Sequence, residues 1–244
     1  MGFQTALWEK WVEFRHSWLR ITMASLVSPL LYLIAFGMGM GAATVNGRPY
    51  IEFLIPGIIA LTTMSTSYNA VALSLNVQRL YEHSFDQIVM SPTSLLEYIL
   101  GQTFGGALRG FYAGCLVLLL SMLFGVRVQV NAVFFVVMLL NGMAFAALGV
   151  MAAILAKTHA DVGRFSTFVI TPMIFLCNTF FSLDTLPRWL AAVIGCLPLS
   201  LASGTLRTIT YGGGVSAAAV GFLAIYLIAF EAAAYLSIMR KENI

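Results

Sequence analysis

Charged residues are scarce in this sequence: only 9% of its 244 residues are Asp, Glu, Lys or Arg, while 60% are hydrophobic. The mean hydropathy is +0.90. A soluble domain of this length needs a much larger polar surface, so the composition excludes an ordinary soluble protein and indicates a membrane protein. The polar remainder is too small for a separate soluble domain. We therefore expect residues 1–244 to form a single membrane domain.

Signals of enzymatic chemistry are also missing. The sequence has no Gly-Lys dipeptide, hence no Walker A motif, and neither GxSxG nor HExxH occurs. Its three histidines are scattered, and its three cysteines lie far apart in apolar surroundings without a CxxC spacing. There is no basic stripe with interleaved aromatic residues, which argues against a nucleic-acid partner. We expect no catalytic residue, no metal site and no cofactor bound by this chain.

Apolar runs of membrane-spanning length are what the sequence contains instead. A helical span needs about 20 predominantly apolar residues. Six segments fit this length: residues 21–43, 53–77, 94–124, 132–155, 165–181 and 215–238. The third carries glycines at helical spacing, typical of a face that packs closely on other helices: Gly101, Gly105, Gly106, Gly110 and Gly114. The expected fold class is an all-α membrane protein with six transmembrane helices.

Two further segments are expected to lie at the membrane surface or within protein. Residues 1–20 form an amphipathic helix with three tryptophans on its apolar half, and tryptophan prefers the headgroup level. We expect this helix to lie in the interface plane. Residues 182–213 contain an apolar core, 189–197, that is too short to cross and is closed by Pro198. We expect an external re-entrant hairpin packed within protein.

The most polar stretch between two spans is residues 78–92. It has helical spacing, stops at Pro92, and carries a cation, two acids and a histidine. A compact polar helix in so apolar a chain is a docking element for a soluble partner. The candidate docking residues are Arg79, Tyr81, Glu82, His83, Ser84, Phe85, Asp86 and Gln87.

The cations are distributed unevenly about the expected spans. Six spans place both termini on one side, together with residues 78–92. That side holds Lys10, Arg15, Arg20, Arg79, Lys157, Arg164, Arg240 and Lys241, and the other holds Arg48, Arg127, Arg188 and Arg207. By the positive-inside rule the richer side, and both termini, face the cytoplasm.

Two charged residues, Arg109 and Glu231, fall inside expected spans. Such residues usually pair with one another or line water. Counting helical rise from the cytoplasmic side puts both at similar depth, so we predict an ion pair between them. Both a packing role and a substrate or proton role are consistent with such a pair.

The second half of the second span is rich in hydroxyl and amide groups, including Ser65, Thr66, Tyr68 and Asn69. One interpretation is that these groups bond to helix carbonyl oxygens or to neighbouring helices. The other is that they form a polar face along a translocation path. The sequence leaves both open.

Two motifs resemble those of a known family. The run Glu82-His83-Ser84-Phe85-Asp86-Gln87-Ile88-Val89-Met90-Ser91-Pro92 and the run from Phe181 through Leu186-Pro187-Arg188-Trp189, with Leu197-Pro198-Leu199-Ser200 and Arg207, are similar to patterns of the ABC-2 type export permeases. The resemblance extends over nearly the whole chain. It is strongest to the short permeases of drug, lipid and nodulation-factor exporters. Ser84 and Phe85 replace the usual Gly-Thr, and Leu197 stands where Asn is usual.

The resemblance implies a permease subunit of an ATP-driven exporter in a bacterial inner membrane. A separate dimer of ATPase subunits, which binds the ATP and Mg, would grip residues 78–92. A second permease subunit, expected to be an identical copy, would pair through the first and fifth spans, surrounded by membrane lipid. The cargo would be amphipathic, lipid-like or a glycolipid. Its path would be lined by Ser65, Thr66, Tyr68 and Asn69 of the second span and by Thr171, Phe175, Asn178 and Thr179 of the fifth.

Two other functions compete with this one. An ion-coupled secondary transporter would use an intramembrane acid such as Glu231, and such transporters are often built from two matching halves. A membrane anchor subunit would hold a complex together without transporting anything.

Overall fold

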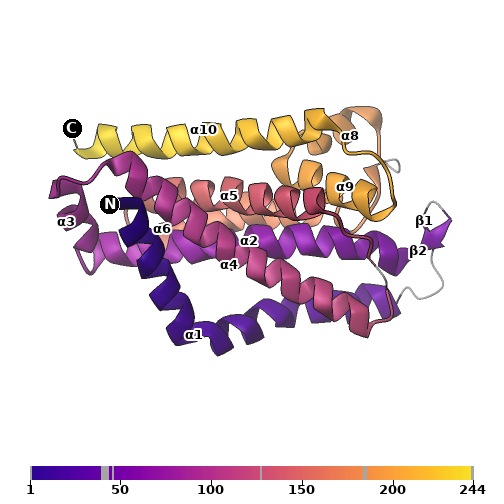
Figure 1. Ribbon diagram of the computed structural model, residues 1–244. Coiled ribbons are helices and arrows are strands. Elements are labelled where there is room, and N and C mark those ends of the chain that lie inside the picture. Colours follow the sequence, from indigo (N-terminus) through magenta and orange to yellow (C-terminus); the bar gives the residue numbers. More distant parts are fainter. Residues whose placement is uncertain (1, 40–43, 46, 127, 184–185, 243–244) are drawn as a thin grey trace.

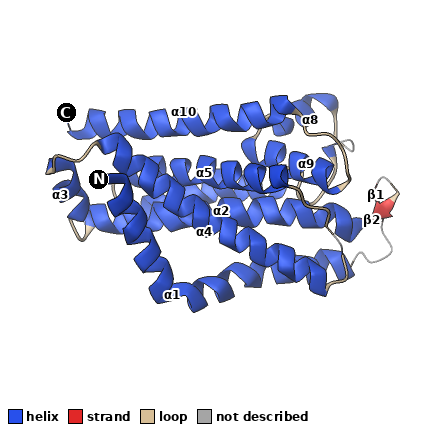
Figure 2. Cartoon of the chain, viewed as in Figure 1, coloured by secondary structure: helices blue, strands red, loops and turns tan. Residues whose placement is uncertain are grey.

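The computed structural model describes residues 2–39, 44–45, 47–126, 128–183 and 186–242. Figure 1 shows a bundle of long helices with the N-terminal end of α1, the C-terminal end of α10 and the short helix α3 at one end. Figure 2 shows helix through most of the chain and one pair of short antiparallel strands, β1 (Thr44–Val45) and β2 (Arg48–Pro49), at the other end. The expected all-α membrane fold is confirmed.

Among the described residues, five helices are long and apolar enough to cross a membrane. They are α1 (Gly2–Tyr32) with its π-helical continuation η1 (Leu33–Met38), α2 (Tyr50–Leu80), α4 (Leu95–Leu123), α5 (Ala132–Leu155) and α10 (Ala217–Glu242). The central core lies where α2, α4 and α5 pack together, around side chains such as Met64, Phe134 and Phe145. Residues 40–43, at the end of the first expected span, lie outside the described residues.

Helix α1 has two parts. Figure 1 shows that it changes direction along its course: the first part slopes away from the N-terminus and the second runs toward the opposite end of the bundle. We call residues 2–20 the N-terminal limb. The buried residues of this limb include Ala6 and Lys10, which pack on α4, whereas Trp8, Trp11 and Trp18 are exposed.

The glycines of α4 serve two neighbours. A Cβ on Gly101 or Gly105 would lie within 2.8 Å of Ala6 or Lys10 of α1. On the other side, a Cβ on Gly110 would lie 1.9 Å from the Ser67 hydroxyl of α2. The expected close-packing role of these glycines is confirmed, and any side chain at Gly110 would push α2 and α4 apart.

The helical run at the fifth expected span begins and ends earlier than predicted and is built of three pieces, α6 (His159–Phe165), η2 (Ser166–Ile170) and α7 (Thr171–Leu176). The helix stops at Leu176 because Cys177 leaves helical geometry and Asn178 has a positive φ of 48°. The prediction that one helix continues to residue 181 is therefore wrong.

The segment 182–213 contains α8 (Arg188–Gly195) and α9 (Pro198–Thr210), which are bent by 91° relative to each other. Pro198 begins α9, since its fixed φ suits a first helical position. A pair bent in this way fits a re-entrant segment or a broken sixth span. The external hairpin stays a prediction, and its residues 184–185 lie outside the described part of the chain.

Candidate functional site

The polar segment expected to dock a partner is divided between two elements. Helix α2 continues to Leu80, so Gln78 and Arg79 belong to its last turn, and α3 (Ser84–Met90) is only seven residues long. The predicted single helix over residues 78–92 is therefore wrong in its boundaries. His83, just before α3, adopts the left-handed conformation with a φ of 52°. This turn lets the chain leave the axis of α2.

Phe85 fixes α3 to the bundle. Its side chain is 1% exposed and lies in an apolar cluster with residues of α2, α4 and α5. Its ring centroid is 6.1 Å from that of Tyr98 on α4. Phe85 was predicted to contact a partner, but in this structure it is the anchor that holds α3 in place.

Arg79 joins α2 to the end of α5. One guanidinium nitrogen, Nη1, donates to the carbonyl oxygens of Ala153 (2.8 Å), Ile154 (2.7 Å) and Ala156 (3.0 Å). These carbonyls lie at the C-terminal end of a helix, where backbone acceptors lack intrahelical donors and a cation is favoured. Arg79, also predicted to dock a partner, serves as a tie between helices here.

The remaining predicted docking residues form a polar surface. Tyr81, Glu82, His83 and Gln87 are exposed, and Ser84 and Asp86 are half-buried. The Asp86 carboxylate lies 3.3 Å from Nδ1 of His83. This surface, which we call the α3 face, lies at the end of the bundle that also carries the two chain ends (Figure 1).

A network of polar side chains behind α3 joins three helices. The Gln78 amide donates to the Glu9 carboxylate of α1 and accepts from the Tyr98 hydroxyl at 3.2 Å. The Gln102 amide of α4 donates to Tyr98 at 3.0 Å and to Glu9 at 3.3 Å. Since Tyr98 also packs on Phe85, α3 is linked to the N-terminal limb through one shared ring.

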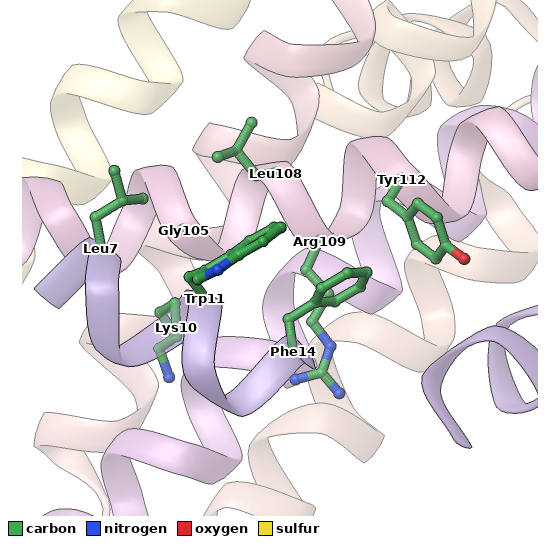
Figure 3. A pocket seen from close by; sticks show the side chains of 8 residues that line it. All are labelled: Leu7, Lys10, Trp11, Phe14, Gly105, Leu108, Arg109 and Tyr112. Carbon is green, nitrogen blue, oxygen red and sulfur yellow. The ribbon is translucent and has the colours of Figure 1, made fainter. Parts of the chain in front are cut away.

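A second set of charges continues the network along the limb. Lys10 is 7% exposed, and its ammonium group donates to Ser74 at 2.6 Å, to the Ala70 carbonyl at 3.3 Å and to Glu13 at 3.2 Å. Arg109 donates to Glu13 at 2.8 Å. Lys10 and Arg109 border a cavity of about 260 Å³ between α1 and α4. Figure 3 shows the side chains that line it. It is lined by Leu7, Lys10, Trp11, Phe14, Gly105, Leu108, Arg109 and Tyr112.

The predicted ion pair between Arg109 and Glu231 is not formed. Arg109 pairs with Glu13 instead, while Glu231 faces Thr103 and leaves Oε1 buried without a hydrogen-bond partner among the described residues. The reason is angular. Thr103 and Arg109 are six positions apart on α4, which places them about 120° apart around the helix axis.

The residues predicted to line a cargo path do not share one surface. Tyr68 and Thr179 are 0% exposed: Tyr68 stacks on Phe165, and Thr179 donates to the Cys177 carbonyl. They cannot line an open path in this conformation. Asn178 is half-buried, and its carbonyl oxygen accepts from Arg207 at 2.8 Å.

The other predicted path residues are partly accessible. Ser65 and Thr66 are half-buried, with the Ser65 hydroxyl 3.3 Å from the Thr62 carbonyl oxygen, while Thr171 and Phe175 are exposed on α7. Asn69 is exposed and lines a polar hollow that also contains Glu13, Glu82 and Arg109.

Several residues of the network were missed at the sequence level. Glu9 and Glu13 lie four positions apart, on one helix face. Gln102 interrupts an apolar span, which was a readable signal for a buried partner. No group of three or more His, Cys, Asp or Glu side chains that could hold a metal ion occurs in the part of the chain that the structure describes.

Comparison with known proteins places the chain in a family. Residues 1–211 match the family model described as ABC-2 type transporter. The chain is 31% identical over 193 residues to the inner membrane transport permease YadH of Escherichia coli K12, covering 76% of this chain and 75% of that protein. It is 28% identical over 203 residues to nodulation protein J of Rhizobium meliloti strain 1021, covering 80% and 78% of the two chains. The chain has several helices able to cross a membrane and belongs to the ABC-2 type transporter family.

Proposed function

We propose that this chain is the membrane subunit of an ATP-driven exporter and that a separate ATPase dimer, which holds ATP and Mg, docks on the α3 face. The observation that carries the proposal is the construction of α3. A seven-residue helix is anchored by one buried aromatic side chain, Phe85. The helix and the turn before it present Tyr81, Glu82, His83 and Gln87 to solvent.

The polar network explains how a push on α3 would reach the membrane. Phe85 packs on Tyr98, Tyr98 bonds to Gln78 and Gln102, and both amides bond to Glu9 of α1. Displacement of α3 therefore acts on α2, α4 and the N-terminal limb together. This motion would connect two packings of the bundle. ATP binding to the partner would shift the population from one packing to the other.

Family membership and orientation support the remaining parts of the proposal. The name of the Escherichia coli relative is that of an inner membrane permease, and both chain ends share the side of α3, which we take as cytoplasmic. A second permease subunit, expected to be an identical copy, would complete the path for an amphipathic, lipid-like or glycolipid cargo. Of the predicted path residues, Asn69, Thr171 and Phe175 are exposed, so they could contact a cargo without rearrangement of the bundle.

The test is co-purification with the ABC ATPases of the same cell, each expressed together with this chain. Glu82→Arg combined with Gln87→Arg changes two exposed α3 side chains and leaves the Phe85 anchor intact. We expect the double variant to be inserted normally, to lose most of the bound ATPase and to lose ATP-dependent transport. Gln129→Arg, at an exposed position beyond the other end of α4, is the matched control and should retain both.

Three outcomes would refute this proposal. If the α3 double variant binds the ATPase as well as the parent does, the docking surface lies elsewhere. If reconstituted protein transports cargo without any ATPase, the chain is an ion-coupled transporter. If the complex forms but nothing is transported in any preparation, the anchor function takes the place of the proposed one.

A further inference from the structure

In the N-terminal limb of α1, the acidic side chains and most of the basic side chains lie in different surroundings. Its two acids, Glu9 and Glu13, face the protein and are bound by partners there. Glu9 accepts from two amides, and Glu13 accepts from Lys10 and Arg109. The charge of Glu13 is thereby balanced by two cations, and the charge of Glu9 is stabilised by hydrogen bonds from two uncharged amides.

The other cations of the limb point outward. Arg15 and Arg20 are exposed, and so is His16 between them. Within the described ranges neither Arg15 nor Arg20 is joined to an acid by an ion pair. The outer surface of the limb is therefore positively charged, although the limb as a whole contains acids.

The tryptophans of the limb are exposed as well. Trp8, Trp11 and Trp18 are 66%, 55% and 52% exposed. Exposed tryptophans in a membrane protein mark the depth of the lipid headgroups. Their neighbours on the same helix, Arg15 and Arg20, are therefore placed at the depth of lipid phosphates.

A surface hollow near the turn of α1 combines both kinds of side chain. It is lined by His16, Ser17, Trp18, Leu19, Arg20 and Met23. A guanidinium and an imidazole are suited to a phosphate group, and the apolar members are suited to the first carbons of an acyl chain. A water-soluble anion would have no use for the apolar part.

We propose that the outer surface of the N-terminal limb binds anionic phospholipid headgroups, with Arg15 and Arg20 meeting the phosphates and the tryptophans lying in the acyl boundary below them. This surface holds the limb at a fixed depth in the leaflet next to α3. The N-terminal limb is then the fixed part of the polar network behind Phe85, and α3 moves relative to it. The binding itself does not depend on the ATPase.

The experiment uses the full chain with Trp189→Phe, so that fluorescence comes only from the three tryptophans of the limb. The protein is reconstituted in phosphatidylcholine vesicles containing an equal fraction of brominated phosphatidylglycerol or of brominated phosphatidylcholine. We expect phosphatidylglycerol to quench several-fold more strongly, because each basic side chain near an anionic leaflet contributes roughly a fivefold factor to binding. Raised salt should weaken this preference.

Two variants in the same background decide the matter. Arg15→Gln with Arg20→Gln should bring the quenching ratio of the two lipids close to one, while Arg164→Gln, an exposed cation of α6, should leave it unchanged. Helix content and size-exclusion behaviour check that each variant is folded. Equal quenching by both lipids in the parent, or a preference that survives in the double variant, would overturn the proposal. A preference that appears only after the ATPase is added would assign the surface to a protein partner and would overturn it equally.

Discussion

Arg109 of α4 donates a hydrogen bond of 2.8 Å to the carboxylate of Glu13 on α1, and so ties the middle of a membrane helix to the N-terminal limb. The two side chains are 25% and 38% exposed. The pair is thus neither a deeply buried ion pair nor a free surface one, and its contribution to stability is reduced by solvent.

The first prediction concerns this pair. We expect a double-mutant cycle with Glu13→Gln and Arg109→Gln to give a coupling energy of about 1 kcal/mol, since contacting charged residues are not additive. The measurement is the free energy of unfolding in detergent. Glu231→Gln combined with Arg109→Gln is the control and should be additive, because those two side chains do not meet. If Glu231 and Arg109 are coupled and Glu13 and Arg109 are not, the ion pair between Arg109 and Glu231 that was predicted from their depth is correct.

The second prediction concerns the anchor of α3. Phe85→Ala removes a buried ring, a change that costs about 3–5 kcal/mol in a closed core. Because α3 is a short terminal element of its cluster, we expect the loss to appear as local opening rather than as global unfolding. Hydrogen exchange of residues 84–90 should become much faster, while exchange in α5 stays slow. Tyr81→Ala, at an exposed position, is the control; unchanged protection in Phe85→Ala would show that α3 is held by something else.

The third prediction concerns the tie between α2 and α5. Arg79→Gln removes the charge-assisted bonds to three carbonyl oxygens at the end of α5. Since a hydrogen bond to a charged group contributes about 1.5–3 kcal/mol, we expect a loss of about 2 kcal/mol in unfolding free energy. Arg240→Gln, an exposed cation at the same end of the bundle, should change it little. If the two variants behave alike, the carbonyl contacts of Arg79 do not stabilise the bundle.

The fourth prediction concerns pH and the start of α6, which lies outside the five candidate spans. Hydrogen bonds from the side chain and backbone of Thr158, helped by the backbone of Lys157 and by the Arg164 charge, lower the pKa of Asp161. A carboxyl whose folded pKa is lowered stabilises the protein above its unfolded pKa, and this contribution is lost as pH falls through the folded pKa.

The matching measurement is the unfolding midpoint of Asp161→Asn and of the parent, from neutral pH to about pH 3. The variant should be less stable at neutral pH, and the difference should shrink as the pH falls below the ordinary range of aspartate. A difference that is independent of pH would mean that Asp161 acts through its shape rather than its charge. Asp86→Asn on α3 provides a comparison with a carboxylate for which His83 is the neighbour.

Much of the fold could be predicted because it depends on long apolar runs. Such runs indicate membrane helices whatever their neighbours in the bundle are. The glycines of α4 were predictable for the same reason, since a row of small residues at helical spacing has one main use. The partner of Arg109 could not be predicted. Helical rise gives the depth of a residue, but the direction in which a side chain points depends on how each helix is rotated and on which neighbour it meets.

The ends of helices were harder to predict than their centres. The one clue in the run 165–181 that the chain leaves helical geometry at Cys177 is Asn178, because asparagine tolerates the left-handed conformation. The contact that stabilises this conformation, a hydrogen bond from Arg207 to the Asn178 carbonyl, could not be predicted. The inward direction of Phe85 had a clue in the sequence: it is the single large apolar side chain among residues 82–87. In a short polar helix that lies on a bundle, a single aromatic side chain is more readily buried against the bundle than exposed to a partner.

The early stop of α7 has a mechanical consequence. Arg207, itself only 7% exposed, gives one hydrogen bond to the Asn178 carbonyl and another to the Phe53 carbonyl, and lies 3.6 Å from the centre of the Phe53 ring. A guanidinium buried in protein in this way cannot readily exchange these acceptors for water. The chain after Leu176 therefore cannot move outward alone. Any movement that opens this end must carry α9 and the start of α2 with it as one body.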